Sequence, residues 1–262
     1  MKTQVLFRKS LAEDGEFETC SRYFPTIECR AHISAGSLVI PRYSALPYYE
    51  ELEQEVDVHG GVLINNLEQH RWIADFHYYR DLRQYTFESW VDSEIYQAPQ
   101  DIAYVVKGKT NSRKFQWNKA MYAENRRRAV EIGADLYADS MIGTQGIVYR
   151  RYVPLKRIED GINGMPMSNE YRFFFYKHHL LASSFYWAIA EPENIPRFVP
   201  PEATKFARHI AEITCHFTNF FVLDVAETEE GNWLLVEVNC GTMSGLSLID
   251  PVNLYANLKG VL

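Results

Sequence analysis

The sequence contains little cysteine and no long apolar segment. Its 4 cysteines among 262 residues form no Cys-x-x-Cys pair, which argues against a disulfide framework and against a zinc site. No run approaches the roughly 18 apolar residues that a membrane-spanning helix needs, and the opening MKTQVLFRKS lacks the apolar core of a signal peptide. We therefore expect a soluble cytoplasmic protein with no membrane partner.

An excess of positive charge is also absent. The formal net charge is −7, so we expect no broadly basic surface and no nucleic-acid partner. Disorder is excluded as well, because 47% of the residues are hydrophobic and 17 Tyr and 15 Phe are present. A chain of this length buries about three quarters of the surface that it exposes when unfolded, which is enough for a sizeable core.

Two strand-like runs near the end of the chain, FFVLDVA and WLLVEVN, flank the polar segment ETEEGN. This pattern predicts a β-hairpin with Gly231 as a turn residue. A two-residue loop at 230–231 would place Asp224 opposite Glu237, with Asn239 on the same face. The sequence therefore predicts three polar groups gathered on one side of the hairpin.

The alternation of the two runs supports this register. The other face of the hairpin would carry only apolar side chains, from Leu223, Val225, Val236 and Val238. Opposed carboxylates repel each other unless a cation or a shared proton lies between them. Carboxylate and amide oxygens suit Mg²⁺, which one or two carboxylates bind together with substrate phosphates. The alternative is that Asp224 and Glu237 merely occupy the solvated face of a half-exposed hairpin.

A run of small residues follows the hairpin, at Gly241, Thr242, Ser244 and Gly245. Such a run lets backbone amides approach an anion closely. An acidic residue on one strand and Glu-x-Asn on the next, here Asp224 and then LVEVN, resembles the metal-binding end of an ATP-grasp domain. In that superfamily these residues hold the Mg²⁺ ions that bridge the phosphates of ATP.

Upstream motifs occur in the order that this resemblance requires. A strand predicted at 102–106 ends at Lys107, and the polar loop GKTNS, which contains Lys109, follows it. An ammonium group and backbone donors in such a place can contact phosphates. Glu170 and Arg172 form an E-x-R pair at the start of a later strand. Two arginines and a lysine in these places resemble the ATP-grasp branch named for that trio, which occurs largely in bacteria and phages.

The resemblance implies an α+β ATP-grasp fold, in which two α+β subdomains grip ATP, preceded by a small α/β domain. The polar, proline-containing stretch QAPQD interrupts the pattern. We therefore place the N-terminal α/β domain at 1–98 and the ATP-grasp domain at 99–262.

Strands and helices alternate in the first domain, which predicts a partly parallel sheet. We expect strands at 5–8, 37–43 and 61–66, and helices at 48–56 and 67–82. A capping box from Asn66 to Gln69 opens the second helix. In the second domain we expect a helix at 117–133, a strand at 147–153, a long loop at 154–169, a hairpin from 170 and an amphipathic helix at 202–218.

The resemblance also implies roles for individual residues. Catalytic roles fall to Lys107 and Arg172. The ATP-binding candidates are Lys107, Lys109, Arg151, Tyr152, Val153, Glu170 and Arg172, and the metal ligands are Asp224, Glu237 and Asn239. Arg150 and Arg151 lie on opposite faces of their strand, so at most one of them faces the nucleotide.

Four residues of the first domain are candidates for the substrate pocket: Arg42, Tyr43, Asn65 and Asn66. They could equally be capping and strand-end polar groups.

The implied activity is that of an ATP- and Mg²⁺-dependent ligase. It would activate a carboxylate of a small molecule or peptide as an acyl phosphate, which an amine or similar nucleophile attacks. Two alternatives stay open. A nucleotidyltransferase would form a lysyl adenylate on Lys107 or Lys109, although the K-x-D-G arrangement of such enzymes is absent. The other is a non-catalytic nucleotide-binding protein.

Overall fold

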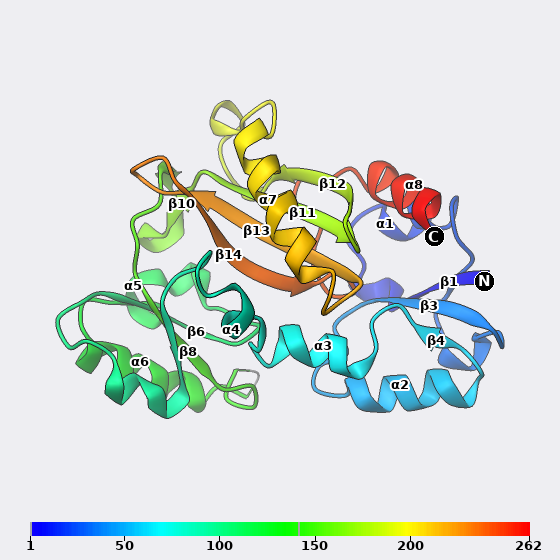
Figure 1. The fold of residues 1–262 in the computed structure, drawn as a ribbon, viewed down its shortest axis with the longest axis horizontal. Coiled ribbons are helices and arrows are strands. Elements are labelled where there is room, and N and C mark those ends of the chain that lie inside the picture. The colour runs from blue at the N-terminus through cyan, green and yellow to red at the C-terminus, as the bar shows by residue number, and fades with distance from the viewer. Residues whose placement is uncertain (1, 141) are drawn as a thin grey trace.

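The first sheet is parallel throughout, whereas the sequence predicts a partly parallel one. The computed structural model describes residues 2–140 and 142–262 (Figure 1). Four parallel strands lie in the order β2-β1-β3-β4, with bounds β1 Lys2–Phe7, β2 Thr26–Ile27, β3 Ser37–Arg42 and β4 Val62–Leu63. The helices of this part are α1 Glu16–Cys20, α2 Tyr49–Val58, α3 Leu67–Ala74 and α4 Tyr78–Leu82.

The capping box that opens α3 is confirmed, because Asn66 accepts from the backbone of Gln69 and Gln69 accepts from the backbone of Asn66. A single helix over 67–82 is wrong. The chain turns at Phe76, whose φ is 66° and whose ring is buried in the core. Burial of this aromatic ring therefore outweighs local helix propensity and divides the segment into α3 and α4.

The second sheet is antiparallel and has the order β5-β8-β6-β7. Its strands are β5 Ser89–Val91, β6 Tyr104–Gly108, β7 Tyr122–Ala123 and β8 Ile147–Arg151. The division between residues 98 and 99 stays a proposal, and β5 from before it pairs with β8 from after it.

The continuous helix expected at 117–133 is wrong. The segment forms α5 Trp117–Ala120, then β7, then α6 Arg126–Tyr137. Asn125 caps α6 by accepting a hydrogen bond from the backbone of Arg128. Gly133 does not end this helix but lies inside it, against the hydroxyl of Tyr149, where a Cβ atom would overlap that oxygen.

We expect Gly133→Ala to lower the free energy of unfolding by about 1–3 kcal/mol, because the added methyl overpacks the contact with Tyr149. Gly260, in the C-terminal helix, is the matched control, because a Cβ atom added there would meet no other atom within 4 Å. At Gly260 alanine should stabilise the fold by up to about 1 kcal/mol. Urea unfolding of both variants measures the difference, and equal effects would contradict the overpacking explanation.

The third sheet is the largest apolar layer. Its antiparallel strands lie in the order β12-β11-β13-β14, with bounds β11 Glu170–Tyr176, β12 His179–Phe185, β13 Phe220–Glu227 and β14 Trp233–Cys240. Helix α7 (Pro201–Thr214) covers one face and α8 (Pro251–Val261) packs on the other (Figure 1). Phe173 and Phe175 belong to the core under α7, whereas Phe174 belongs to the core under α8. Successive side chains of β11 thus alternate between the two faces of the sheet, as in any strand.

The segment at 154–169 is not a plain loop. It contains the antiparallel pair β9 (Arg157–Asp160) and β10 (Pro166–Ser168). Met165 and Met167 are buried in the core against the third sheet, which anchors the pair. Two short strands with few apolar residues leave no periodicity in the sequence, so this hairpin was not predictable from alternation.

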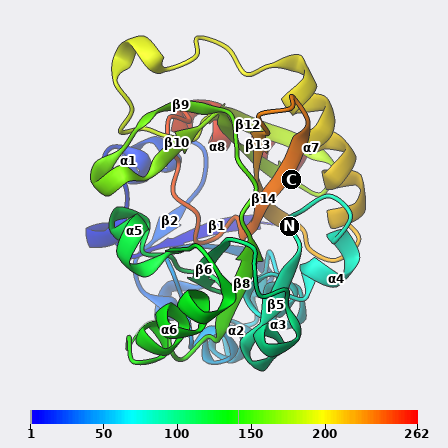
Figure 2. The ribbon, with the colours of Figure 1, turned by 90° about the vertical axis from the view of Figure 1, so that its left-hand side faces the viewer.

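The described residues also form six short 3-10 helices: Lys9–Leu11, Arg30–His32, Asp92–Gln97, Lys114–Gln116, Ile162–Gly164 and Pro192–Asn194. Figure 2 shows β9 and β10 above the second sheet and α5, with the third sheet beside them. Among the described residues, no helix has the length and apolar character needed to cross a membrane.

Candidate functional site

The register of the β13–β14 hairpin is confirmed at its polar end. Asp224 pairs with Glu237 and Val222 pairs with Asn239. The pairing nearer the turn differs from the prediction, because a bulge between Asp224 and Val225 shifts it by one residue. Beyond the bulge, Val225 pairs with Leu235 rather than with Val236.

The bulge changes which residue enters the core. Leu235 is fully buried there, and Val236, expected on that face, instead lines a cavity on the other side. The backbone carbonyl of Val236 accepts a hydrogen bond from Arg150 at 2.5 Å. The extra residue therefore aims a carbonyl oxygen at the cavity, as bulges beside functional sites often do.

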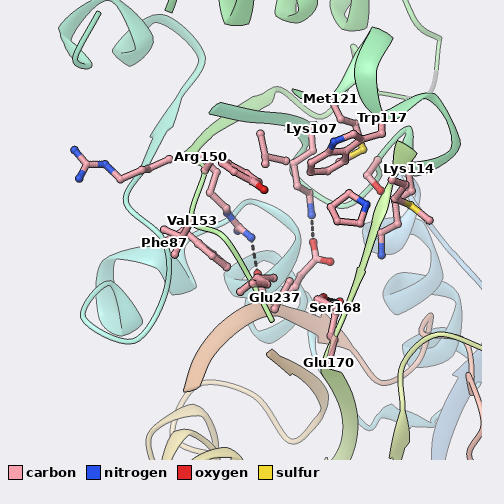
Figure 3. A pocket seen from close by; sticks show the side chains of 18 of the residues that line it. Phe87, Lys107, Lys114, Trp117, Met121, Arg150, Val153, Ser168, Glu170 and Glu237 are labelled. Carbon is pink, nitrogen blue, oxygen red and sulfur yellow. Dashed lines mark hydrogen bonds and ion pairs between the residues drawn. The ribbon is translucent and has the colours of Figure 1, made fainter. Parts of the chain in front are cut away.

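The cavity lies between the second and third sheets and encloses ≈ 890 Å³, part of it open to solvent. Its apolar walls include Val105, Trp117, Met121, Val153, Met165 and Trp187. Its charged lining includes Lys107, Lys114, Arg150, Arg151, Glu170 and Glu237. Figure 3 shows Lys107 and Arg150 reaching from the second sheet towards Glu237 on the third. A mostly apolar pocket with a few convergent polar groups is typical of a small-molecule site.

Lys107 and Glu237 form an ion pair across this cavity. Burial lowers the pKa of Lys107, and the attraction of Glu237 offsets only part of that effect. For Glu237, burial acts to raise the pKa, but Lys107 and, to a smaller extent, Arg150 and Lys114 lower it overall. Glu237 is therefore held as a carboxylate facing several cations.

Asp224 lies at the centre of a second, largely buried network. Its two oxygens accept hydrogen bonds from Nε and Nη2 of Arg172, both at 2.8 Å. Asn239 donates to Asp224 Oδ2 at 3.0 Å, and Arg172 Nη1 donates to the carbonyl of Gly245 at 2.8 Å. Asp224 is 1% exposed and Arg172 9%. The predicted grouping of Asp224, Glu237 and Asn239 on one face, beside Lys107 and Arg172, is thus observed.

The structure distinguishes between the two adjacent arginines of β8. Arg150 is buried, and its Nε and Nη2 have no hydrogen-bond partner among the described residues. Arg151, the candidate chosen from the sequence, is half-exposed and pairs with Glu88 at 3.1 Å. Both arginines line the cavity, so Arg151 stays a candidate, and we propose the more deeply buried Arg150 as a further nucleotide-facing arginine.

The segment after β8 lines the cavity with Leu155 and with Tyr152 and Val153, two of the candidates for ATP binding. The amide of Tyr152 is used within the fold, because it donates to the carbonyl of Ala103 at 2.8 Å. Pro154 has no amide hydrogen to offer. A nucleotide base that contacts this segment would therefore bond to other backbone groups or stack on apolar side chains.

Lys109 does not line the main cavity. It lies in an adjoining hollow together with Arg172, Asn239, Met243 and Ser244. Lys109 therefore faces a different space from the one that Trp117 and Val153 line.

Lys114 is a site residue that the sequence reasoning missed. Its ammonium group donates to the hydroxyl of Tyr186 and lies near Glu170. Burial acts to lower the pKa of Lys114, but Tyr186 and Glu170 raise it overall. Lys114 follows a polar loop without periodicity, and nothing in the sequence separates it from the neighbouring Arg113.

Glu170, which the sequence predicted beside Arg172, is 4% exposed and accepts a hydrogen bond from Ser168 at 3.3 Å. Burial raises its pKa to about 7; Lys114 and Arg172 act to lower it and Asp224 to raise it. The carboxyl group therefore changes its protonation near neutral pH, whereas an unfolded glutamate has a pKa near 4.5.

We expect the Glu170→Gln variant to gain stability relative to the wild type as the pH rises. The folded state holds the proton of Glu170 more tightly than the unfolded state, so its contribution is fully present below about pH 4.5 and is lost as the pH rises towards 7. The loss approaches about 1.4 kcal/mol per pH unit between these values. Urea unfolding at pH 5, 6, 7 and 8 measures the difference, and a pH-independent difference would contradict the assignment.

The four substrate candidates of the first domain have structural roles. Arg42 is buried and bonds to Glu16 at 2.8 Å, and to the carbonyls of Gly241 and Ser244. Asn65 holds the backbone of 219–220 in three hydrogen bonds. Asn66 caps α3, and Tyr43 packs in the N-terminal core. These contacts agree with the alternative that the four residues are capping and strand-end polar groups.

The proposed metal ligands are two carboxylates and an amide side chain that are neighbours on the β13–β14 hairpin. The described residues contain no cluster of three His, Cys, Asp or Glu that could hold a metal alone. Mg²⁺ characteristically keeps only one or two protein carboxylates and completes its shell with phosphate oxygens and water. Asp224, Glu237 and Asn239 therefore fit Mg²⁺ that is bound together with a phosphorylated ligand.

Solved structures with the same fold span nearly the whole chain. Against the D-cycloserine synthetase DcsG, the TM-score is 0.65 with 13% identity, covering 99% of both chains. Against a RimK domain ATP-grasp protein from Sphaerobacter thermophilus it is 0.59 with 14% identity, covering 98% of both. Against the macrocyclase MdnC from Microcystis aeruginosa, bound to its precursor peptide MdnA, it is 0.57 with 8% identity, covering 99% of both.

No curated protein matches the sequence. A family model for the ATP-grasp domain of R2K clade family 3 matches residues 96–258, well over half of the chain. ATP and Mg²⁺ are the nucleotide and metal of ATP-grasp domains. The order of Lys107, Arg172, Asp224 and Glu-x-Asn, the α+β fold and this match agree, and the chain belongs to the R2K clade of ATP-grasp domains.

Proposed function

We propose that this protein is an ATP- and Mg²⁺-dependent ligase that activates a substrate carboxylate as an acyl phosphate, which an amine or similar nucleophile attacks. One observation carries the proposal. Three cations, Lys107, Arg150 and Arg172, converge with the opposed carboxylates of Asp224 and Glu237 where two sheets meet over a deep cavity. Cations beside paired carboxylates suit a nucleotide's phosphates and the metal that accompanies them.

The proposed reaction has two steps. In the first, a carboxylate oxygen of the substrate bonds to the γ-phosphorus of ATP, the bond to the β,γ-bridging oxygen breaks, and ADP leaves. In the second, the amine attacks the acyl carbon, the bond to the phosphate oxygen breaks, and phosphate leaves while the amine loses a proton. Mg²⁺, when bound, neutralises the charge that develops on the transferring phosphoryl group.

The residues of the chain have distinct proposed roles in the first step. The guanidinium of Arg150, a residue that lines the cavity, and the ammonium of Lys107 bind phosphate oxygens. Arg172 stabilises the phosphoryl group in transfer, and Asp224, Glu237 and Asn239 hold Mg²⁺. Apolar side chains such as Trp117 and Val153 exclude water from the base.

The adjoining hollow suits the carboxylate substrate. It is lined by Arg172 and Lys109 and by apolar groups including Leu46 and Met243. DcsG is a D-cycloserine synthetase and MdnC is bound to a precursor peptide, so relatives of this fold differ widely in substrate size. We propose a small molecule or a peptide carrying a carboxylate as the substrate here.

Hydroxylamine trapping tests the proposal without knowledge of the nucleophile. The purified protein is incubated with ATP, Mg²⁺, hydroxylamine and a panel of amino acids and short peptides. We expect one class of carboxylate to give a hydroxamate together with an equal amount of ADP. Release of AMP with a covalent adenylate on the protein, measured by intact mass, would favour the lysyl-adenylate alternative. Nucleotide binding without turnover of any panel member would favour a non-catalytic protein.

A further inference from the structure

The ring of Tyr186 lies beside two cations of the site at once. Lys114 Nζ is 4.2 Å from the ring centroid and Arg172 Cζ is 4.7 Å from it. The hydroxyl of Tyr186 also accepts a hydrogen bond from the ammonium group of Lys114. One side chain therefore contacts both cations through its ring and one of them through its oxygen as well.

These two cations come from different parts of the fold. Lys114 begins the 3-10 helix Lys114–Gln116, which follows β6 of the second sheet, and Arg172 lies on β11 of the third. Two positive charges drawn to one place repel each other. The electron-rich face of an aromatic ring attracts both of them, and the nearby Glu170 adds negative charge when ionised. Tyr186 thus offsets the repulsion where the two sheets meet.

Neither Arg172 nor Tyr186 lies deep in the apolar part of the cavity. Arg172 is bonded to Asp224, which pairs across the hairpin with Glu237 and accepts a hydrogen bond from Asn239. Glu237 and Asn239 are the two other proposed metal ligands. The Lys114 and Tyr186 pair therefore belongs to the metal end of the site rather than to the end lined by Tyr152 and Val153. A ligand's terminal phosphate lies at this end if the nucleotide base lies at the other.

We propose that Tyr186 is a positioning residue that holds Lys114 and Arg172 together around the terminal phosphate of ATP. This inference rests on the proposed function. Its consequence is selectivity for a nucleoside triphosphate over a diphosphate, because a diphosphate has no group at the place where Tyr186 brings the two cations together.

A purely structural role predicts something different. Tyr186 stacks edge-to-face on Trp187 at 4.9 Å, so loss of its ring could simply loosen the cavity wall. A loosened wall weakens the binding of diphosphate and triphosphate alike. Loss of the contacts that hold the two cations together weakens the binding of the triphosphate only.

The test compares affinities for ADP and for a non-hydrolysable ATP analogue, AMPPNP, by isothermal titration in excess Mg²⁺. We expect Tyr186→Leu to weaken AMPPNP binding by about tenfold or more while ADP binding changes by no more than about twofold. Tyr186→Phe keeps the ring and should retain AMPPNP affinity within about threefold. Tyr85→Phe is the matched control, because it removes a comparable tyrosine hydroxyl bond, to His209 at 3.0 Å, outside the site; both affinities should be unchanged.

Equal losses for ADP and AMPPNP in Tyr186→Leu, or no loss in either, would overturn the inference. A wild-type protein that binds neither nucleotide would overturn the proposed function and, with it, the role inferred for Tyr186.

Proton–carbon spectra of the lysine side chains, recorded without nucleotide, separate these failures. The rings of Tyr186 and Trp187 should shift the ε-methylene protons of Lys114 upfield, with the signal assigned by its absence in Lys114→Arg. The part of this shift that the Tyr186 ring causes should be lost in Tyr186→Leu, while the part that Trp187 causes remains. If the wild type shows the shift caused by Tyr186 but binds no nucleotide, the proposed function is wrong. If the wild type lacks this shift, Tyr186 does not hold Lys114 in place.

Discussion

Replacement of Glu237 by glutamine is expected to reduce Mg²⁺-dependent ATP turnover by about 10²–10³-fold or more while the protein remains folded. Glutamine has nearly the same shape, but it cannot supply the negative charge that a divalent cation requires. The fold tolerates the change because the partner is a lysine. Burial already lowers the pKa of Lys107, so its ammonium group can release a proton once Glu237 is gone.

Release of ADP with the substrate pair found by trapping, or slow basal hydrolysis of ATP, measures this effect, and urea unfolding checks the fold. Glu227→Gln is the matched control, since Glu227 lies on the same hairpin and pairs with Lys156 at 2.9 Å outside the cavity lining. Turnover should be nearly unchanged in that control. Full turnover by Glu237→Gln would remove Glu237 from the proposed metal ligands.

The second large effect is on stability. We expect Asp224→Asn to lower the free energy of unfolding by about 3–5 kcal/mol, because it leaves the buried guanidinium of Arg172 without its carboxylate. Arginine differs from lysine in that its guanidinium cannot be deprotonated in a protein. The loss of Asp224 should therefore cost more stability than the loss of Glu237, although both are carboxylates in ion pairs.

A double variant distinguishes the buried charge from a general disturbance of β13. Adding Arg172→Met to Asp224→Asn removes the uncompensated cation and should recover much of the lost stability, without recovery of ATP turnover. Urea unfolding of the two single variants and the double variant measures the coupling. Equal costs for Asp224→Asn and Glu237→Gln, or no recovery in the double variant, would contradict this account of the network.

The hairpin shows how far local patterns reach. A two-residue loop at 230–231 predicted Asp224 opposite Glu237, and alternation supported this register because a one-residue slip would have mixed polar and apolar side chains. The same reasoning placed Val236 in the core, whereas Leu235 is buried there. A bulge adds one residue to a strand without a clear mark in the composition, so the pattern could not reveal it.

The two arginines of β8 show a second limit. The period of two determined that Arg150 and Arg151 point to opposite faces. The period could not determine which of the two side chains is buried, because this depends on how the third sheet packs against β8. The packing of Phe76 and Phe87 near the guanidinium of Arg150 completes this buried environment.

Lys114 and Tyr186 were beyond the reach of the sequence for a related reason. They are 72 residues apart and belong to segments that no periodicity connects. Each resembles an ordinary polar residue at the end of a loop or strand. Their contact forms only when the second and third sheets are placed against each other.

The sequence by itself determined a partly parallel first sheet and the hairpin with its opposed carboxylates. These follow from periodicity and short spacings, which act within one strand, helix or turn. The α+β class came from the resemblance of the ordered motifs to an ATP-grasp domain. Tertiary structure alone decided that Arg150 enters the cavity, that Lys109 lies in the adjoining hollow, and that Tyr186 joins Lys114 to Arg172. Such choices depend on how separate sheets pack, since a side chain's partners there are far away along the chain.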